Sequence, residues 1–168
     1  AQQYDFPHKV FDYQDKFFIG VISNFVESYA NGETPVPCIQ CNQTVKFSDL
    51  LEESKNLNAD TLVTGHYAIR KGGLRESKLF KAKDKKKDQS YFLFATLQDQ
   101  LDYVRFPLGN YLKSEIRQMA NDYKLVVSDK PDSQDICFVT SDSYRDLVNK
   151  LQPGINKKGN IFDINGNK

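Results

Sequence analysis

Along this chain, segments with apolar residues at helical spacing alternate with short segments of β-branched residues. This alternation limits the folds that the chain can adopt. Residues 13–29 carry apolar side chains at intervals of three and four, which predicts a helix with one apolar face that stops at Asn31 and Gly32. Residues 61–64 (Thr-Leu-Val-Thr) predict a buried strand that ends at Gly65. Helices that alternate with buried strands are typical of an α/β fold with a parallel sheet.

Other segments continue the alternation. Strands are predicted at 9–11 and 125–127, helices at 45–57, 114–123 and 141–151, and a β-hairpin around Gly72 and Gly73. Residues 90–97 are aromatic and fit helix or strand. Two prolines predict an extended, non-helical backbone over residues 34–42.

Composition excludes several classes of protein. The 168 residues are enough for one domain with its own core. No apolar run approaches the roughly 20 residues of a membrane helix, and the start of the chain has no features of a signal peptide. The net charge of +1 argues against a polyelectrolyte binder, so nucleic-acid contact requires a local patch. One lysine-rich segment qualifies, although such a run is also typical of a solvated loop: Lys81, Lys83, Lys85, Lys86 and Lys87.

The chain has three cysteines, an odd count that argues against a disulfide framework and favours a reducing compartment. Cys38 and Cys41 form a CxxC pair, which suits a redox pair, half of a zinc site, part of an iron–sulfur site, or simply two small buried residues. A closed zinc site would need further ligands from Cys137, His8 and His66.

Two further positions are candidates for chemistry. Cys137 lies between Ile136 and Phe138, and these apolar neighbours favour a buried, inert thiol over a catalytic one. Gly65 and His66 directly follow a predicted strand, and ligands of open α/β sheets bind at the carboxyl ends of strands. A lone histidine is nevertheless more often a satisfied hydrogen-bonding residue than a catalyst.

Four segments together resemble one family. Residues 34–47, 64–67, 87–93 and 132–138 are similar, in that order, to the bacterial tRNA-specific 2-thiouridylases, and the resemblance covers nearly the whole chain. It implies a Rossmann-like parallel sheet with flanking helices, of the adenine nucleotide alpha hydrolase type. Residues 1–152 would then form a partial ATP-pyrophosphatase-type catalytic domain with a tRNA-contacting helical part. The polar residues 153–168 would begin a following β domain or form a disordered tail.

The resemblance also implies a reaction and a location. Such a cytoplasmic sulfurtransferase uses ATP with Mg²⁺ to adenylate the C2 oxygen of the wobble uridine, position 34 of tRNA. A cysteine persulfide, loaded by a sulfur-relay donor protein, then supplies sulfur to give 2-thiouridine. By similarity, Cys41 corresponds to the nucleophile and Cys137 to the persulfide carrier, and the transfer leaves a disulfide between them. Gly65 corresponds to an ATP contact and His66 to a tRNA contact. The other implied contacts are Val36, Pro37 and Cys38 with the target base, and Lys87, Asp88 and Gln89 with tRNA.

The sequence departs from the family in two ways. It has neither the Ser-Gly-Gly-x-Asp-Ser phosphate loop nor the C-terminal β-barrel, so we expect a fold incomplete at its N-terminus and a chain inactive by itself. Cys38 stands where some relatives carry Asp. With Cys41 and Cys137 it makes three thiolates that could hold a [4Fe–4S] cluster. The alternative hypothesis is therefore a metal- or cluster-binding, tRNA-docking module without turnover of its own. Substrate tRNAs, sulfur donor and oligomeric state are left open.

Overall fold

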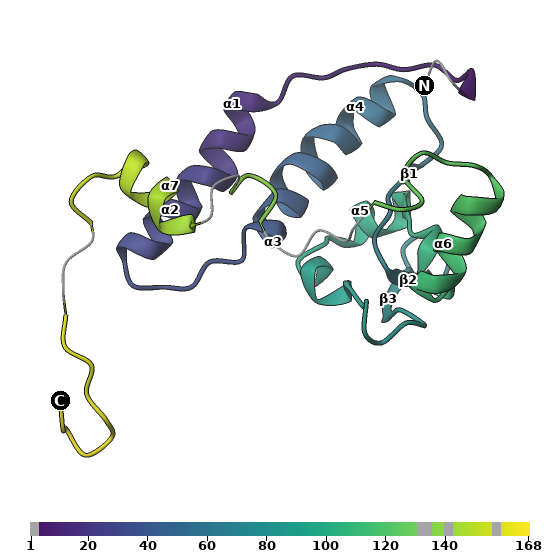
Figure 1. The fold of residues 1–168 in the computed structure, drawn as a ribbon. Helices are drawn as coiled ribbons and strands as arrows, with labels where there is room; N and C mark the ends of the chain where they lie inside the picture. Colours follow the sequence, from purple (N-terminus) through teal and green to yellow (C-terminus); the bar gives the residue numbers. More distant parts are fainter. Residues whose placement is uncertain (1–3, 131–135, 140–142, 156–158) are drawn as a thin grey trace.

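The computed structural model describes residues 4–130, 136–139, 143–155 and 159–168. Two long helices begin the fold and lead into a small α/β body (Figure 1). The first consists of α1 (Gln14–Phe17), η2 (Phe18–Ser23) and α2 (Asn24–Ala30), and the second of α3 (Pro37–Cys41), η3 (Asn42–Asp49) and α4 (Leu50–Asn56). Both continue without a break, and η2 and η3 are stretches of π-helix inside them.

The α/β body contains two small sheets. Strand β1 (Leu62–Val63) pairs in parallel with β4 (Val104–Arg105), and the Thr64 N–H extends this ladder by donating to the Arg105 carbonyl at 3.0 Å. Strands β2 (Ala68–Lys71) and β3 (Lys78–Lys81) form an antiparallel hairpin. The hairpin is confirmed, and the strand predicted at 61–64 is present at Leu62–Val63, but it is not buried as predicted, because Val63 is exposed. Strand β4 was not predicted from the sequence.

Glycine is required at two points near the hairpin. Gly72 ends β2 with a φ of +106°, a conformation that favours glycine. Gly109 lies in η5 (Pro107–Asn110), where a Cβ atom would overlap the carbonyl oxygen of Ala68. This close approach lets η5 pack directly against β2.

The remaining helices are η4 (Ser90–Leu93), α5 (Gln98–Tyr103), α6 (Lys113–Asp122) and α7 (Tyr144–Leu151). The helix predicted at 114–123 is confirmed by α6. The one predicted at 141–151 is confirmed from residue 144 onward, with the Ser143 hydroxyl accepting from the Arg145 N–H at 3.1 Å as an N-cap. Residues 141–142 are outside the described ranges.

Three sequence predictions are wrong. Residues 9–11 and 125–127 are not strands, because neither segment has a neighbouring strand among the described residues with which to pair. Residues 37–41 are helical, not extended. Pro37 occupies the first turn of that helix, where a missing N–H costs nothing and the fixed φ suits the helix.

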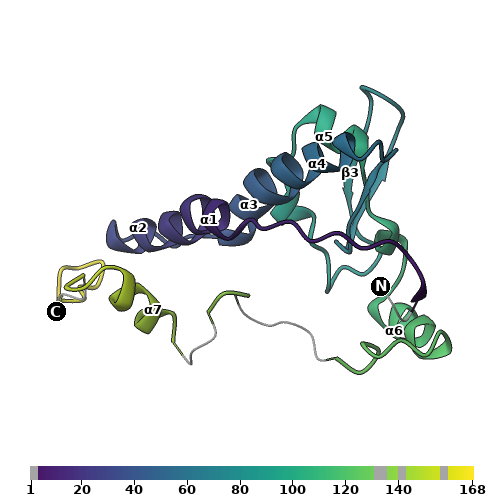
Figure 2. The same ribbon diagram turned by 90° about the horizontal axis from the view of Figure 1, so that it is seen from above.

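Buried side chains form two separate clusters. The first lies in the α/β body and includes Phe47, Leu51, Leu93, Val104 and Phe106. The second lies between α2 and α7 and includes Phe25, Val26 and Val148. The helix α3–η3–α4 contacts η2 at its beginning and supplies Phe47 and Leu51 to the first cluster further along, so it connects the two (Figure 2).

Candidate active site

The CxxC pair lies at the start of a long helix, with Cys38 in its first turn and Cys41 as the last residue of α3. Cys38 and Cys41 both belong to α3, directly after the buried Pro37, and Cys38 is exposed while Cys41 is partly buried. The first N–H groups of a helix have no intrahelical acceptor, and this end of the helix dipole favours a thiolate. This dipole effect acts on Cys38, whereas burial acts against the thiolate form of both cysteines.

Cys137 is held at the surface by its two neighbours. Phe138 meets the rings of Phe17 and Phe25 edge-on, at centroid distances of 5.7 and 5.3 Å, and Ile136 packs against the same cluster. The Val139 N–H donates to the Ile136 carbonyl at 3.0 Å and closes a turn, with Cys137 exposed on it. The interpretation of Cys137 as a buried thiol is wrong, because the flanking apolar residues pack, partly buried, against the cluster while Cys137 faces solvent.

The three thiols lie within electrostatic range of one another and of Lys46. Burial is the main cause that raises the pKa of Cys38 and of Cys41, and the proximity of Cys137 raises both pKa values further. Lys46 opposes these effects and lowers the pKa of both thiols. Lys46 follows Cys41 by five residues, which is the hydrogen-bond spacing of the π-helix that contains it. Lys46 was not among the site residues expected from the sequence.

Gly65 and His66 lie at the carboxyl end of β1, beside the same helix. The His66 ring lies 6.1 Å from the ring of Phe47, the residue after Lys46, and 6.2 Å from the ring of Phe106, which follows β4. Gly65 is exposed, and a Cβ there would meet only the Leu108 side chain, at 3.8 Å. The carboxyl end of β1 is thus exposed at Gly65, and the ligand contact predicted there stays a prediction.

His66 is a neutral side chain at physiological pH. Burial, and secondarily Lys46, lower its pKa to about 4. Its Nδ1 lies 2.9 Å from the Thr64 hydroxyl, which orients the ring. A neutral imidazole can contact RNA through hydrogen bonding or stacking, but it contributes no positive charge towards a phosphate.

Asp88 and Gln89 hold their own loop in place. Asp88 Oδ1 accepts from the Ala82 N–H at 2.7 Å, and its Oδ2 accepts from the Ser90 hydroxyl at 2.8 Å. Gln89 bonds Tyr67 twice, because its side-chain oxygen accepts from the Tyr67 N–H at 2.9 Å and its own N–H donates to the Tyr67 carbonyl at 2.8 Å. These bonds tie the lysine-rich loop, including Lys87, to the start of β2. Sequence reasoning missed this internal role.

The segment that enters the cysteine turn borders a cavity. Val36 and Pro37 line a space of about 310 Å³ to which none of the described cysteines contributes.

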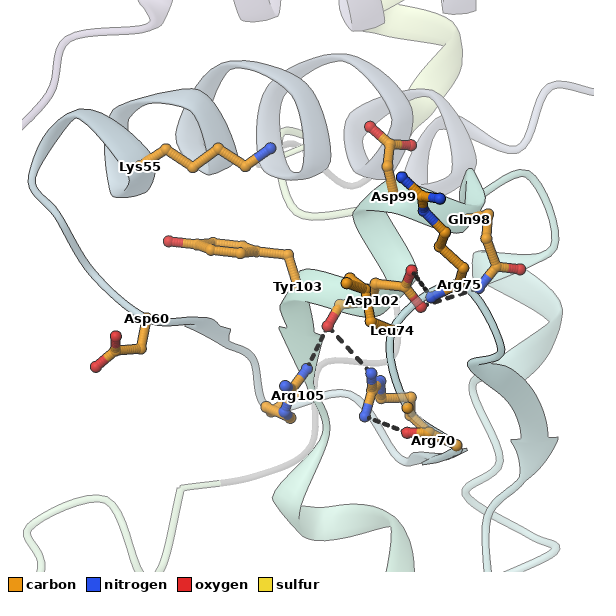
Figure 3. Close-up of a pocket in the computed structure, with 12 residues that line it drawn as sticks. Lys55, Asp60, Arg70, Leu74, Arg75, Gln98, Asp99, Asp102, Tyr103 and Arg105 are labelled. Carbon is orange, nitrogen blue, oxygen red and sulfur yellow. Dashed lines mark hydrogen bonds between the residues drawn. The ribbon is translucent and has the colours of Figure 1, made fainter.

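A larger cavity, of about 840 Å³, lies away from these residues (Figure 3). Its lining residues Asp60 and Tyr103 precede β1 and β4, so it occupies the amino ends of the parallel strands. Arg105 and Arg70 both donate to the Asp102 carbonyl there, at 2.7 and 3.1 Å. The site residues predicted from the sequence do not line this cavity, and it lies opposite the edge that carries Gly65.

Within the ranges that the structure describes, no group of three or more His, Cys, Asp and Glu side chains is placed to hold a metal ion, so the three cysteines do not form a ready cluster site there. No helix of the described residues is both long and apolar enough to cross a membrane.

Comparison with known proteins gives a consistent result. Residues 1–141 match the family described as tRNA methyl transferase HUP domain. The chain is 57% identical over 166 residues to a tRNA-specific 2-thiouridylase MnmA of Orientia tsutsugamushi, and 54% and 51% identical to proteins of the same name from a Wolbachia species and Rickettsia bellii. Each alignment covers 99% of this chain and 45% of the relative, so the chain spans about half the length of these curated relatives.

A HUP domain is a Rossmann-like α/β fold, in agreement with the parallel β1–β4 pair and its flanking helices. The fold class and the family resemblance expected from the sequence are both confirmed. By its match over residues 1–141 and its likeness to these relatives, the chain belongs to the tRNA methyl transferase HUP domain family.

Proposed function

We propose that the chain is the catalytic part of a cytoplasmic tRNA-uridine 2-sulfurtransferase that thiolates the wobble uridine, position 34. The observation that carries this proposal is the placement of Cys137, exposed on an anchored turn and within electrostatic range of Cys38 and Cys41 at the start of a helix. At Phe47 the same helix lies beside His66, next to Gly65, where Gly65 is open and His66 is neutral. Nucleophile, sulfur carrier and nucleotide contact thereby fall within one region.

The first step activates the base. The C2 oxygen of uridine 34 attacks the α-phosphorus of ATP, which enters with Mg²⁺ as substrate, and pyrophosphate leaves. Gly65 supports this step because its backbone can approach the nucleotide without a side chain in between. Lys87 would contact tRNA phosphate from the loop that Asp88 and Gln89 hold.

The second step transfers sulfur. The terminal sulfur of a Cys137 persulfide, loaded by a donor protein, attacks C2 and displaces AMP. The Cys41 thiolate then attacks the Cys137 Sγ, so the sulfur–sulfur bond breaks, 2-thiouridine is released and a Cys41–Cys137 disulfide remains. A dithiol reductant must reset this disulfide before the next turnover.

Nucleoside mass spectrometry of tRNA tests the proposal. The complete protein, given tRNA, ATP and a persulfide donor, is expected to form 2-thiouridine, whereas Cys41→Ser and Cys137→Ser proteins with unchanged urea unfolding form none. Full thiolation by either variant would refute the assigned roles. Methylation, which the family description suggests, gives a different nucleoside mass and is separated in the same spectrum.

The hypothesis of a cluster-binding module is tested in the same preparation. It requires iron and labile sulfide bound through Cys38, Cys41 and Cys137, and chelation should then destabilise the fold. The arrangement of the described residues gives it no support. Thiolation by an iron-free preparation would exclude it.

A further inference from the structure

The cavity of about 310 Å³ beside the CxxC turn is lined both by apolar side chains and by side-chain amides. Val36, Pro37 and Phe94 supply apolar surface, and Asn24, Gln40 and Gln43 supply side-chain amides. The side chains lining it are uncharged. The three amide groups make no hydrogen bond to the part of the chain that the structure describes, so their donors and acceptors remain available. Such walls fit a flat, uncharged ligand with a hydrogen-bonding edge.

Phe94 is held outward by a fixed support. Leu93, its neighbour in sequence, is buried in the first cluster with 1% of its surface exposed. The Asn42 side-chain amide donates to the Phe92 carbonyl at 2.9 Å, which ties η4 to the helix that carries the cysteines. Phe94 is 68% exposed and Tyr91 is 63% exposed, with ring centroids 6.3 Å apart. Exposed aromatic rings on a rigid support are the surfaces on which unpaired bases stack.

The position of the cavity distinguishes its ligand from the reacting base. The base that reacts must reach Cys41 and Cys137, but the described walls of the cavity include neither residue. Val36 and Pro37 nevertheless belong to both the cavity wall and the segment that enters the cysteine turn. The lysine-rich loop comes shortly before η4 and Phe94 in the chain.

We propose that this cavity binds an unpaired nucleobase next to the reacting uridine, stacked on Phe94 and with its edge at the Gln40 and Gln43 amides. The proposal rests on the proposed function, since it assumes an RNA substrate with its target base at the cysteines. Phe94 thereby helps to select RNA whose bases on one side of the target can leave the stack.

Fluorescence of a labelled RNA tests the proposal. The complete protein is titrated with an anticodon stem-loop in which 2-aminopurine replaces the nucleotide on one side of the target uridine, and then the nucleotide on the other side. Wild-type protein is expected to quench one of the two probes. Phe94→Ala should abolish that quenching and weaken binding about 10-fold, as expected for loss of one stacked base. Phe94→Tyr should retain both properties.

Two further variants make the result specific. Gln43→Leu, an exposed position, should weaken binding about threefold through loss of a hydrogen bond to the base edge. Tyr123→Ala removes a ring that is 76% exposed at the end of α6 and should change nothing. Unchanged quenching and affinity in Phe94→Ala would overturn the inference, even if the wild-type protein forms 2-thiouridine. Failure of the wild type to form 2-thiouridine would count against the proposed function, while the quenching would still decide whether a base occupies the cavity.

Discussion

The ring of Phe138 meets the ring of Phe25 edge-on, with centroids 5.3 Å apart, and this contact positions the residue before it, Cys137. Phe25 belongs to α2 and is 1% exposed, so the turn that carries the thiol is attached to a fixed helix. The proximity of Cys137 to the CxxC pair thus depends on packing between segments more than a hundred residues apart in sequence.

Phe138→Ala should slow disulfide formation between Cys41 and Cys137 by about 10-fold in the complete protein treated with a mild oxidant. The substitution removes the ring contacts with Phe17 and Phe25, so the turn loses its anchor and the effective concentration of one thiol near the other falls. Disulfide formation is followed by mass spectrometry of trapped peptides. Phe80→Ala, on the distant hairpin, is the matched control and should react at the wild-type rate. An unchanged rate in Phe138→Ala would show that the ring does not position Cys137.

Lys46→Met should slow alkylation of Cys38 and Cys41 at neutral pH by about two- to fivefold. Lys46 lowers the pKa of both thiols, so its removal raises both pKa values and leaves less thiolate to react. The measurement is the rate of iodoacetamide labelling at each cysteine as a function of pH. Lys46→Arg retains the charge and should label at nearly the wild-type rate, as should Lys55→Met, because Lys55 lies at the other end of the same helix over the Tyr103 ring. Equal labelling of Lys46→Met and wild type would refute the electrostatic role.

Local sequence patterns predicted those parts of the fold that local interactions form. The apolar spacing of residues 13–29 and 114–123 and the glycines at 72–73 are each sufficient for their elements. Strand β4 has only two residues, too few for any periodicity, and it exists as a strand because Val104 pairs with Leu62. Residues 125–127 show the reverse case, since their β-branched composition suits a strand but no described strand lies beside them as a partner.

In the candidate site, too, local features could be predicted from the sequence and features that depend on the three-dimensional structure could not. The CxxC spacing and the glycine after β1 are visible in the sequence, but the helical conformation of Cys38 and Cys41 was missed because Pro37 was interpreted as a helix breaker and not as a first-turn residue. The role of Lys46 depends on a π-helix, for which the sequence offers no simple signal. Residues 153–168 form no helix or strand where they are described, and their assignment to a following domain stays a prediction.

The free energy of unfolding should fall by about 2 kcal/mol between pH 7.5 and pH 5 because of His66 alone. Its pKa is about 4 in the folded chain and 6.5 in the unfolded chain, so the unfolded state takes up a proton first as the pH falls. The stability contributed by the neutral ring is complete above pH 6.5 and is lost as the pH falls towards 4. Urea unfolding at both pH values measures it. Between these pH values the free energy of unfolding of His66→Gln should fall by about 2 kcal/mol less than that of wild type. The decrease in His8→Gln should equal that of wild type, because His8 is exposed. A pH dependence of His66→Gln identical to that of wild type would contradict the prediction.

Gly109→Ala should destabilise the fold by about 1–3 kcal/mol, whereas Gly65→Ala should leave the free energy of unfolding within about 0.5 kcal/mol of wild type. A Cβ at position 109 overlaps the Ala68 carbonyl and forces η5 away from β2, but a Cβ at position 65 makes only an ordinary contact with Leu108, at 3.8 Å. Urea unfolding measures both values, with Gly73→Ala as a control at a position where a Cβ meets nothing within 4 Å.

ATP binding should be sensitive to Gly65→Ala even though stability is not. If Gly65 approaches ATP, the added methyl group in Gly65→Ala should weaken ATP binding to the complete protein by about 10-fold, because the backbone can no longer reach the nucleotide as closely. Calorimetry of ATP binding measures the effect, and Gly73→Ala again serves as the control. A Gly65→Ala protein with wild-type stability and wild-type ATP affinity would show that the nucleotide does not contact this end of β1. A loss of affinity without a loss of stability can arise only at the ligand, since the fold tolerates a methyl group there.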